Sequence, residues 1–237
     1  MEFTGQHALV TGGGSGIGLA VAHAVARAGG TVTIVGRDPK RLEEAVGAIG
    51  PAARFARADI MREDDLERIA SGEGVIDHLV TAAGPMPADG PVLDVPIQQA
   101  RALFEGKFWG QMLTVRALAA RIRPGGSITM FSGTLARKPA GGVPIFASID
   151  GAIESLGRVM AIDLAPTRVN VVAPGIIDTP MLRGQGEAAA QAMLAGYGER
   201  VLVGRAGQPE DVARAVMFLM GNGFVTGSVL DIDGGKK

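Results

Sequence analysis

The 237-residue sequence has no cysteine, few aromatic residues and almost no excess of charge of either sign. Without cysteine the chain forms no disulfide and uses no thiolate, which is compatible with a reducing compartment. Aromatic residues make up 4% of the chain and hydrophobic residues 47%, so aliphatic side chains must supply most of the core. The formal net charge of −1 gives no electrostatic reason to expect binding to nucleic acid or to an anionic membrane.

Long apolar runs and targeting segments are also lacking. No stretch stays apolar and uncharged over the roughly 20 residues that a membrane-spanning helix needs. The opening residues, MEFTGQHALV, do not combine a basic segment with a long apolar one, so we predict no signal peptide. The histidines (His7, His23 and His78) show no metal-ligand spacing. We therefore expect a cytoplasmic protein that uses no metal.

Segments with strand character and segments with helix character alternate along the chain. The first are 8–10, 31–35, 54–58, 76–81, 127–131, 168–172 and 229–232, and the second are 17–28, 39–49, 63–70, 97–122, 145–164 and 210–220. Such repeated units with apolar strands predict an α/β fold, a doubly wound parallel sheet (Rossmann fold) with helices on both faces, in a single domain over residues 1–237. In this architecture ligands bind beyond the carboxyl ends of the strands.

The stretch TGGGSGIG, residues 11–18, stands between the first strand and the first helix. Glycines at such a turn let the backbone approach a pyrophosphate, whose charge is met by free N–H groups and by the positive end of the helix dipole. This context is the one that a dinucleotide-binding motif needs, although an ordinary glycine-rich turn is the alternative. The expected contacts come from Gly12, Gly14, Ser15, Gly16, Ile17 and Gly18.

The turn after the second strand bears on the choice of cofactor. Arg37 offers a guanidinium for the 2′-phosphate of NADP, and Gly36 leaves room for that phosphate. Asp38 suits the ribose hydroxyls of NAD instead, or it caps the helix that begins at Pro39. We predict NADP over NAD. Asp59, after the third strand, is either a contact to the adenine amino group or a cap for the next helix.

In five motifs the sequence resembles the classical short-chain dehydrogenase/reductase family. The family's TGxxxGxG appears at 11–18, its NNAG as TAAG at 81–84, and its PG motif within NVVAPGIIDTP at 170–180. The carboxyl-terminal signature appears as GRAGQPEDVA at 204–213, followed by FVTGSVLDIDGG at 224–235.

The resemblance implies an NADP(H)-dependent oxidoreductase for a carbonyl or alcohol substrate. It also implies a homo-oligomer (dimer or tetramer) and a substrate lid at about 181–203, which contains the sole tyrosine, Tyr197. This tyrosine is either a relocated acid or a packing residue. The further cofactor contacts that the resemblance implies come from Asp59, Ile60, Ala82, Ala83, Gly84, Pro174, Gly175, Ile177 and Thr179.

The catalytic positions depart from the family pattern. Ser132 matches the family's serine, but Phe146 and Asp150 stand at the Tyr and Lys positions, and Lys107 stands at the Asn position. Phe146 has no proton to give, and loss of a positioned acid typically costs about 10²- to 10⁴-fold in rate. If Lys107 pairs with Asp150, its ammonium lies near the place of the family's lysine. Lys107, or a water that it polarises alongside Ser132, is then able to donate the proton.

Two other interpretations of these positions stay open. The pair of Lys107 and Asp150 is alternatively an ion pair that only holds two helices together. The chain is alternatively an NADP(H)-binding protein without redox catalysis, acting as a sensor, as a structural partner or as an enzyme for non-redox chemistry.

Overall fold

One seven-stranded sheet forms the centre of the computed structural model, which describes residues 2–85, 90–184 and 186–236. All neighbouring strands are parallel, in the order β3-β2-β1-β4-β5-β6-β7. The order reverses between β1 and β4, as the predicted doubly wound fold requires. The strands are β1 (His7–Thr11), β2 (Thr31–Gly36), β3 (Ala53–Arg57), β4 (Ile76–Thr81), β5 (Ile122–Phe131), β6 (Arg168–Pro174) and β7 (Val229–Ile232).

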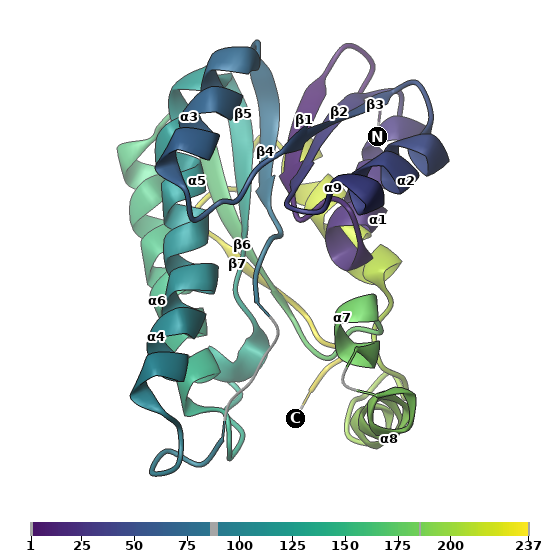
Figure 1. Ribbon diagram of the computed structural model, residues 1–237, viewed down its shortest axis with the longest axis vertical. Coiled ribbons are helices and arrows are strands. Elements are labelled where there is room, and N and C mark those ends of the chain that lie inside the picture. Colours follow the sequence, from purple (N-terminus) through teal and green to yellow (C-terminus); the bar gives the residue numbers. More distant parts are fainter. Residues whose placement is uncertain (1, 86–89, 185, 237) are drawn as a thin grey trace.

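Helices cover both faces of the sheet (Figure 1). One face carries α1 (Gly16–Arg27), α2 (Pro39–Ile49) and α9 (Pro209–Gly221), and the other carries α3 (Glu63–Gly72), α5 (Gly110–Leu118) and α6 (Pro144–Asp163). Each face has its own aliphatic core, and every residue of β4 is buried. Because central strands are covered on both sides, consecutive apolar residues face opposite cores, as Leu79 and Val80 of β4 do.

The helix predicted over 97–122 is interrupted and ends early. It consists of α4 (Ile97–Phe104), a π-helical turn (Glu105–Trp109) and α5, and a short 3₁₀ turn then leads into β5. Glycines allow this helix to lie close to neighbouring loops: a Cβ on Gly106 would come within 3.1 Å of Pro85, and one on Gly110 within 2.7 Å of Ile60. The π-helical turn accommodates one extra residue at this crossing.

Strand β5 begins at Ile122, five residues before the predicted start at 127. The proline and glycines at 124–126 are typical of a loop, which is why the sequence pattern misses the first part of the strand. Ile122 pairs with Ile76, and a shift in register before the His78 pair absorbs the irregular residues.

Two helices lie among the described residues between β6 and α9, a region that the sequence pattern leaves irregular. They are α7 (Pro180–Arg183) and α8 (Glu187–Gly198), and both lie beyond the carboxyl ends of the strands (Figure 1). Alanine is the best helix former, and the alanine-rich part of the predicted lid is helical for that reason. Residues 86–89, in the connection between β4 and α4, and residue 185, in the predicted lid at 181–203, lie outside the described residues.

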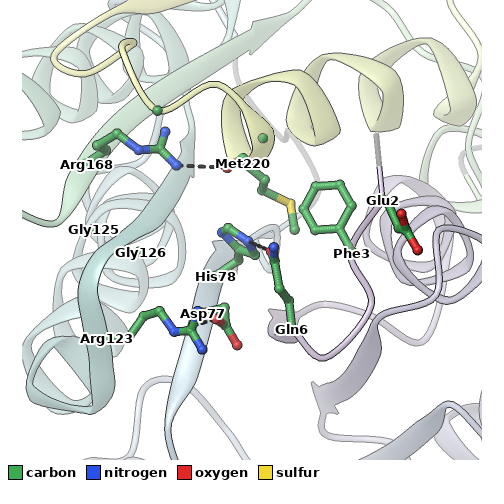
Figure 2. Close-up of a pocket in the computed structure, with 12 residues that line it drawn as sticks. Glu2, Phe3, Gln6, Asp77, His78, Arg123, Gly125, Gly126, Arg168 and Met220 are labelled. Carbon is green, nitrogen blue, oxygen red and sulfur yellow. Dashed lines mark hydrogen bonds and ion pairs between the residues drawn. The ribbon is translucent and has the colours of Figure 1, made fainter.

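A cavity of about 300 Å³ lies at the opposite edge, among the amino ends of β4, β5 and β6 (Figure 2). His78 lines it, with one ring nitrogen 2.8 Å from the Ser127 hydroxyl and the other 2.7 Å from the side-chain oxygen of Gln6. The Arg168 guanidinium donates to the carbonyl of Leu219, 2.6 Å away in the last turn of α9. A cation bound to the last carbonyls stabilises a helix end, so Arg168 has a structural role here.

Burial of His78 predicts a loss of stability in mild acid. Burial lowers the pKa of this imidazole from 6.5 to about 4, so the native state favours the neutral ring. The unfolded chain takes up the proton at a higher pH, and the native state is therefore destabilised as the pH falls from about 6.5 to about 4. The full shift corresponds to a loss of about 3 kcal/mol in the free energy of unfolding. Urea denaturation across this pH range measures the loss.

The control is His78→Gln, which keeps a donor and an acceptor but does not titrate. Its free energy of unfolding should fall less over the same range, and equal losses in both proteins would contradict the prediction. Burial opposes ionisation of Glu73, but hydrogen bonds from His7 and Arg54 hold its pKa down at about 2. The contribution of the Glu73 carboxylate to the free energy of unfolding is consequently lost mainly at a lower pH than that of His78.

Candidate functional site

The glycine turn after β1 forms a close-packed cradle at the start of α1. A Cβ on Gly12, whose φ is +71°, would lie 2.8 Å from the backbone nitrogen of Ala83, and one on Gly18 would overlap the carbonyl of Gly12. Ser15 is the N-cap of the helix in an extended conformation, and its side chain makes no hydrogen bond to the N–H groups of this helix start. Its first turn contains no acidic residue. The N–H groups at the start of α1 are thus arranged for an anion.

Segments distant in sequence lie against this turn. Ala82 and Ala83, at the carboxyl end of β4, lie next to Gly12, and the methyl group of Thr179 would be 3.5 Å from a Cβ on Gly16. The Thr179 hydroxyl itself accepts a hydrogen bond from the backbone N–H of Leu182 as the cap of α7. The structure thus brings together the predicted residues of the glycine motif, the TAAG motif and the stretch after the PG motif.

Two arginines lie side by side at the carboxyl ends of β2 and β3. Arg37 and Arg57 are exposed, and the Arg57 Nε donates to the Arg37 carbonyl at 3.3 Å. Asp38 accepts hydrogen bonds from the backbone N–H groups of Lys40 and Arg41 and caps α2. Of the two roles that the sequence leaves open for Asp38, the structure confirms the helix cap.

Asp59 and Ile60 lie in the turn after β3. The Asp59 carboxylate accepts a hydrogen bond from the Met61 N–H at 3.0 Å, while the residue at the cap position of α3 is Arg62. The suggestion that Asp59 caps the next helix is therefore wrong, because its short side chain closes the turn before that helix. Ile60 packs against Gly110, at the start of α5.

Lys107 and Asp150 form an ion pair beyond the carboxyl end of β5. The ammonium nitrogen lies 2.6 Å from Oδ1 of Asp150, 3.2 Å from the backbone carbonyl of Ser132 and 5.0 Å from the centre of the Phe146 ring. The side chain of Asp150 is 2% exposed and that of Lys107 14%, so the pair is largely removed from water. Gly133 makes room for it, because a Cβ there would lie 2.6 Å from Asp150 Oδ2.

Ser132 turns its hydroxyl away from this ion pair. The oxygen lies 3.4 Å from a carboxylate oxygen of Glu154 and 3.5 Å from the carbonyl of Val172, so the backbone carbonyl of Ser132, not its hydroxyl, is the group that meets Lys107. Glu154 is buried and forms an ion pair with Arg137. Glu154 is not among the residues that the sequence motifs indicate, although it lies one helical turn after Asp150 and shares its face.

The ion pair is continuous with the glycine turn. The alkyl chain of Lys107 would lie 3.9 Å from a Cβ on Gly84, the last residue of the TAAG motif, which itself follows the alanines packed on Gly12. The path from Gly12 through Gly84 to Lys107 and Asp150 runs along the carboxyl edge of the sheet, where the fold predicts a ligand site.

The PG motif and the lid meet at this same edge. A Cβ on Gly175, which follows Pro174, would collide with the Tyr197 ring, and Ile177 pairs with Gly207 in an isolated bridge. The Tyr197 hydroxyl donates to the carbonyl of Asp233 at 2.9 Å, and burial raises the pKa of this phenol. Tyr197 is therefore a packing residue in this structure.

Clustered metal ligands and membrane-spanning helices are both lacking in the part of the chain that the structure describes. Among residues 2–85, 90–184 and 186–236, no group of three or more His, Asp or Glu side chains is arranged to hold a metal ion. Within the same ranges, no helix is long and apolar enough to cross a membrane.

Comparison with known proteins gives the family. A family described as "Enoyl-(Acyl carrier protein) reductase" matches residues 12–237. The short-chain dehydrogenase/reductase malC of Malbranchea aurantiaca is 33% identical over 98% of this chain and 94% of its own length. The chain belongs to the short-chain dehydrogenase/reductase family.

Solved structures agree with this assignment. A small-chain dehydrogenase in complex with NADPH has a TM-score of 0.81 and 33% identity, with 97% of each chain covered. A structure described as the MalC Reductase/Diels-Alderase of Malbranchea aurantiaca has a TM-score of 0.88 and 31% identity, with 98% of this chain and 96% of that chain covered.

The burial of the ion pair predicts a strong coupling between its partners. Lys107→Met leaves the Asp150 carboxylate buried without its cation, and such a loss typically costs about 3 to 5 kcal/mol in the free energy of unfolding. The double variant Lys107→Met/Asp150→Leu removes both charges and should be more stable than Lys107→Met alone. Urea denaturation of the parent, both single variants and the double variant measures the coupling. Strictly additive effects would contradict it.

Proposed function

We propose that this protein is an NADP(H)-dependent oxidoreductase that acts on a carbonyl or alcohol and uses Lys107 in its proton route. The observation that carries the proposal is the 2.6 Å contact between Lys107 and the buried Asp150, at the sheet edge that also holds the glycine turn. A buried ammonium in that place supplies a proton donor where Phe146 offers none.

The residues of the cradle fit a dinucleotide. Backbone atoms lie so close to Gly12 and Gly18 that neither position has room for a Cβ. The start of α1 presents N–H groups, and its first turn contains no acidic residue. The similarity to a dehydrogenase solved with NADPH supports NADP(H) as the ligand. The proposed binding residues are Gly12, Gly14, Ser15, Gly16, Ile17, Gly18, Arg37, Asp59, Ile60, Ala82, Ala83, Gly84, Pro174, Gly175, Ile177 and Thr179.

The choice of NADP over NAD rests on Arg37. Its guanidinium is exposed at the end of β2, and the neighbouring Arg57 adds a second positive charge at the same corner. The acidic residue that would suit NAD, Asp38, already accepts two backbone hydrogen bonds from α2. A 2′-phosphate therefore meets cations here.

The proton route starts at Lys107. When bound, NADPH supplies a hydride to the carbonyl carbon, and the carbonyl oxygen then needs a proton. An ammonium has three N–H donors, and Asp150 and the Ser132 carbonyl account for two of them. The third is the donor that we assign to the substrate oxygen, directly or through one water. The side chain is 14% exposed, so solvent is able to restore its proton.

A homo-oligomer in the cytoplasm remains part of the proposal. Val159 and Ile162, on the outer side of α6, are 52% and 76% exposed, and exposed aliphatic residues close together on one helix are typical of an interface between subunits.

The second candidate is an NADP(H)-binding protein without redox catalysis. Two of the three Lys107 donors are already used by protein acceptors, and the residue at the family's Tyr position is an apolar ring. One similar structure is described as a Reductase/Diels-Alderase, so that relative combines reduction with a non-redox reaction. Tight binding of NADPH without turnover on a broad panel of aldehydes, ketones and quinones would favour this second candidate.

Replacement of Arg37 should weaken NADPH binding selectively. Loss of a charge-assisted hydrogen bond costs about 1.5 to 3 kcal/mol, so Arg37→Met should raise the Kd for NADPH by about 10- to 100-fold while the Kd for NADH changes little. Fluorescence titration with both nucleotides measures this. Arg121→Met, an exposed arginine at the opposite edge of the sheet, is the control. An equal change for NADPH and NADH would contradict the assignment.

Replacement of Lys107 tests the proton route. Lys107→Met should lower kcat for NADPH oxidation by about 10²-fold or more while the Kd for NADPH stays within a few-fold, because the variant loses the acid and not the cradle. The measurement is NADPH oxidation across the panel of carbonyl substrates. Activity equal to that of the parent would exclude a catalytic role for Lys107.

A matched control separates this effect from general destabilisation. Arg123→Met removes the cation that lies 2.7 Å from another buried carboxylate, that of Asp77, at the amino edge of the sheet. It should lower the free energy of unfolding and leave kcat within a few-fold of the parent. A kcat lowered as much by Arg123→Met as by Lys107→Met would assign the loss to stability alone.

A further inference from the structure

Gln111 makes four hydrogen bonds with one side-chain amide in the interior of the protein. Its oxygen accepts from the Thr81 hydroxyl at 2.7 Å and from the Phe131 N–H at 2.8 Å. Its nitrogen donates to the Phe131 carbonyl at 2.8 Å and to the Lys107 carbonyl at 3.1 Å. The residue is 1% exposed, so all four bonds form away from water.

The amide takes the place of a missing strand partner. The pairs between β4 and β5 end at Val80 and Thr129, whereas β5 continues beside β6 as far as the pair of Phe131 and Val172. The Phe131 N–H and carbonyl therefore have no strand partner on the β4 side. Gln111 binds both groups as a backbone peptide would, which satisfies two buried polar groups at the point where β4 and β5 diverge.

The same amide connects this strand end to Lys107. Its second N–H reaches back one helical turn to the Lys107 carbonyl, in the π-helical turn. The side chain of Lys107 in turn contacts the carbonyl of Ser132, the residue after Phe131. Gln111 thus links the main chain of Lys107 to Phe131, and the Lys107 ammonium binds the carbonyl of the next residue, Ser132.

We propose that Gln111 is a positioning residue for Lys107: it holds the π-helical turn against the end of β5 and thereby sets where the ammonium lies. The proposal rests on the function proposed for Lys107, but its geometric part is measurable without turnover. Gln111 does not itself reach the ion pair and acts through the Lys107 main chain.

The test is the accessibility of the Lys107 amine. In the parent, burial and the contact with Asp150 should make its acetylation by dilute acetic anhydride slower than that of the exposed Lys40, as mass spectrometry of the native protein measures. Gln111→Met keeps the volume and removes all four bonds. The ratio of Lys107 to Lys40 acetylation should rise by about fivefold or more, the factor that corresponds to about one hydrogen bond.

Asn170→Leu is the matched control. This buried amide also bridges backbone, since it donates to the Val225 carbonyl at 2.9 Å and accepts from the Ser228 N–H at 3.1 Å, but it lies between β6 and the segment before β7. Its loss should lower the free energy of unfolding without changing the acetylation ratio of Lys107. An equal rise of the ratio in both variants would overturn the proposal, because general loosening would then explain it.

Thr81→Val keeps the proposal testable if Gln111→Met does not fold. It removes one of the four bonds with little change in shape, and the ratio should then rise measurably above that of the parent. An unchanged ratio in every folded variant overturns the role of Gln111.

Turnover separates this proposal from the function that it rests on. If the parent reduces a carbonyl, Gln111→Met should lower kcat while the Kd for NADPH stays within a few-fold. If the parent shows no turnover, the proposed function fails, while a raised acetylation ratio still supports Gln111 as the residue that positions Lys107.

Discussion

A carboxylate buried at the end of a parallel sheet needs a cation close to it, and the arrangement of the site depends on that need. The Asp150 side chain is 2% exposed, and an unpaired charge there would cost several kcal/mol. Lys107 meets it from a different helix, so one contact joins the π-helical turn to α6 across the end of β5. Gly133 leaves room for the Asp150 carboxylate because it has no side chain, and the carbonyl of Ser132 accepts a further hydrogen bond from the Lys107 ammonium.

The parallel sheet explains why chemistry gathers at one edge. All strands end on the same side, so the glycine turn after β1, the alanines after β4 and the ion pair beyond β5 become neighbours although they are far apart in sequence. Polar groups at the other edge have structural partners instead: Arg168 caps α9, and His78 bonds to Gln6 and Ser127. The cavity there is lined by groups that hold the fold together (Figure 2).

Much of the fold follows from local patterns, and the departures have local causes. Every predicted strand is present, but β5 starts early because its proline and glycines look like a loop, and the long helix is divided by a π-helical turn that hydrophobic spacing does not reveal. Helix α8 is not predicted because its alanines carry little amphipathic pattern. The pairing of Lys107 with Asp150 was predictable from the family positions, whereas the contacts of Gln111 and Glu154 were not, since their partners lie on other elements.

The sequence by itself determined the class of fold and the glycine turn, because strand and helix periodicity and the conformational freedom of glycine are properties of short segments. Only the tertiary structure decided how the ambiguous side chains are used. Asp38 caps a helix, Tyr197 packs against the PG motif, and Ser132 offers its carbonyl rather than its hydroxyl to Lys107. Each of these outcomes depends on which groups from distant elements lie within hydrogen-bond distance, and the packing of helices on the sheet sets that.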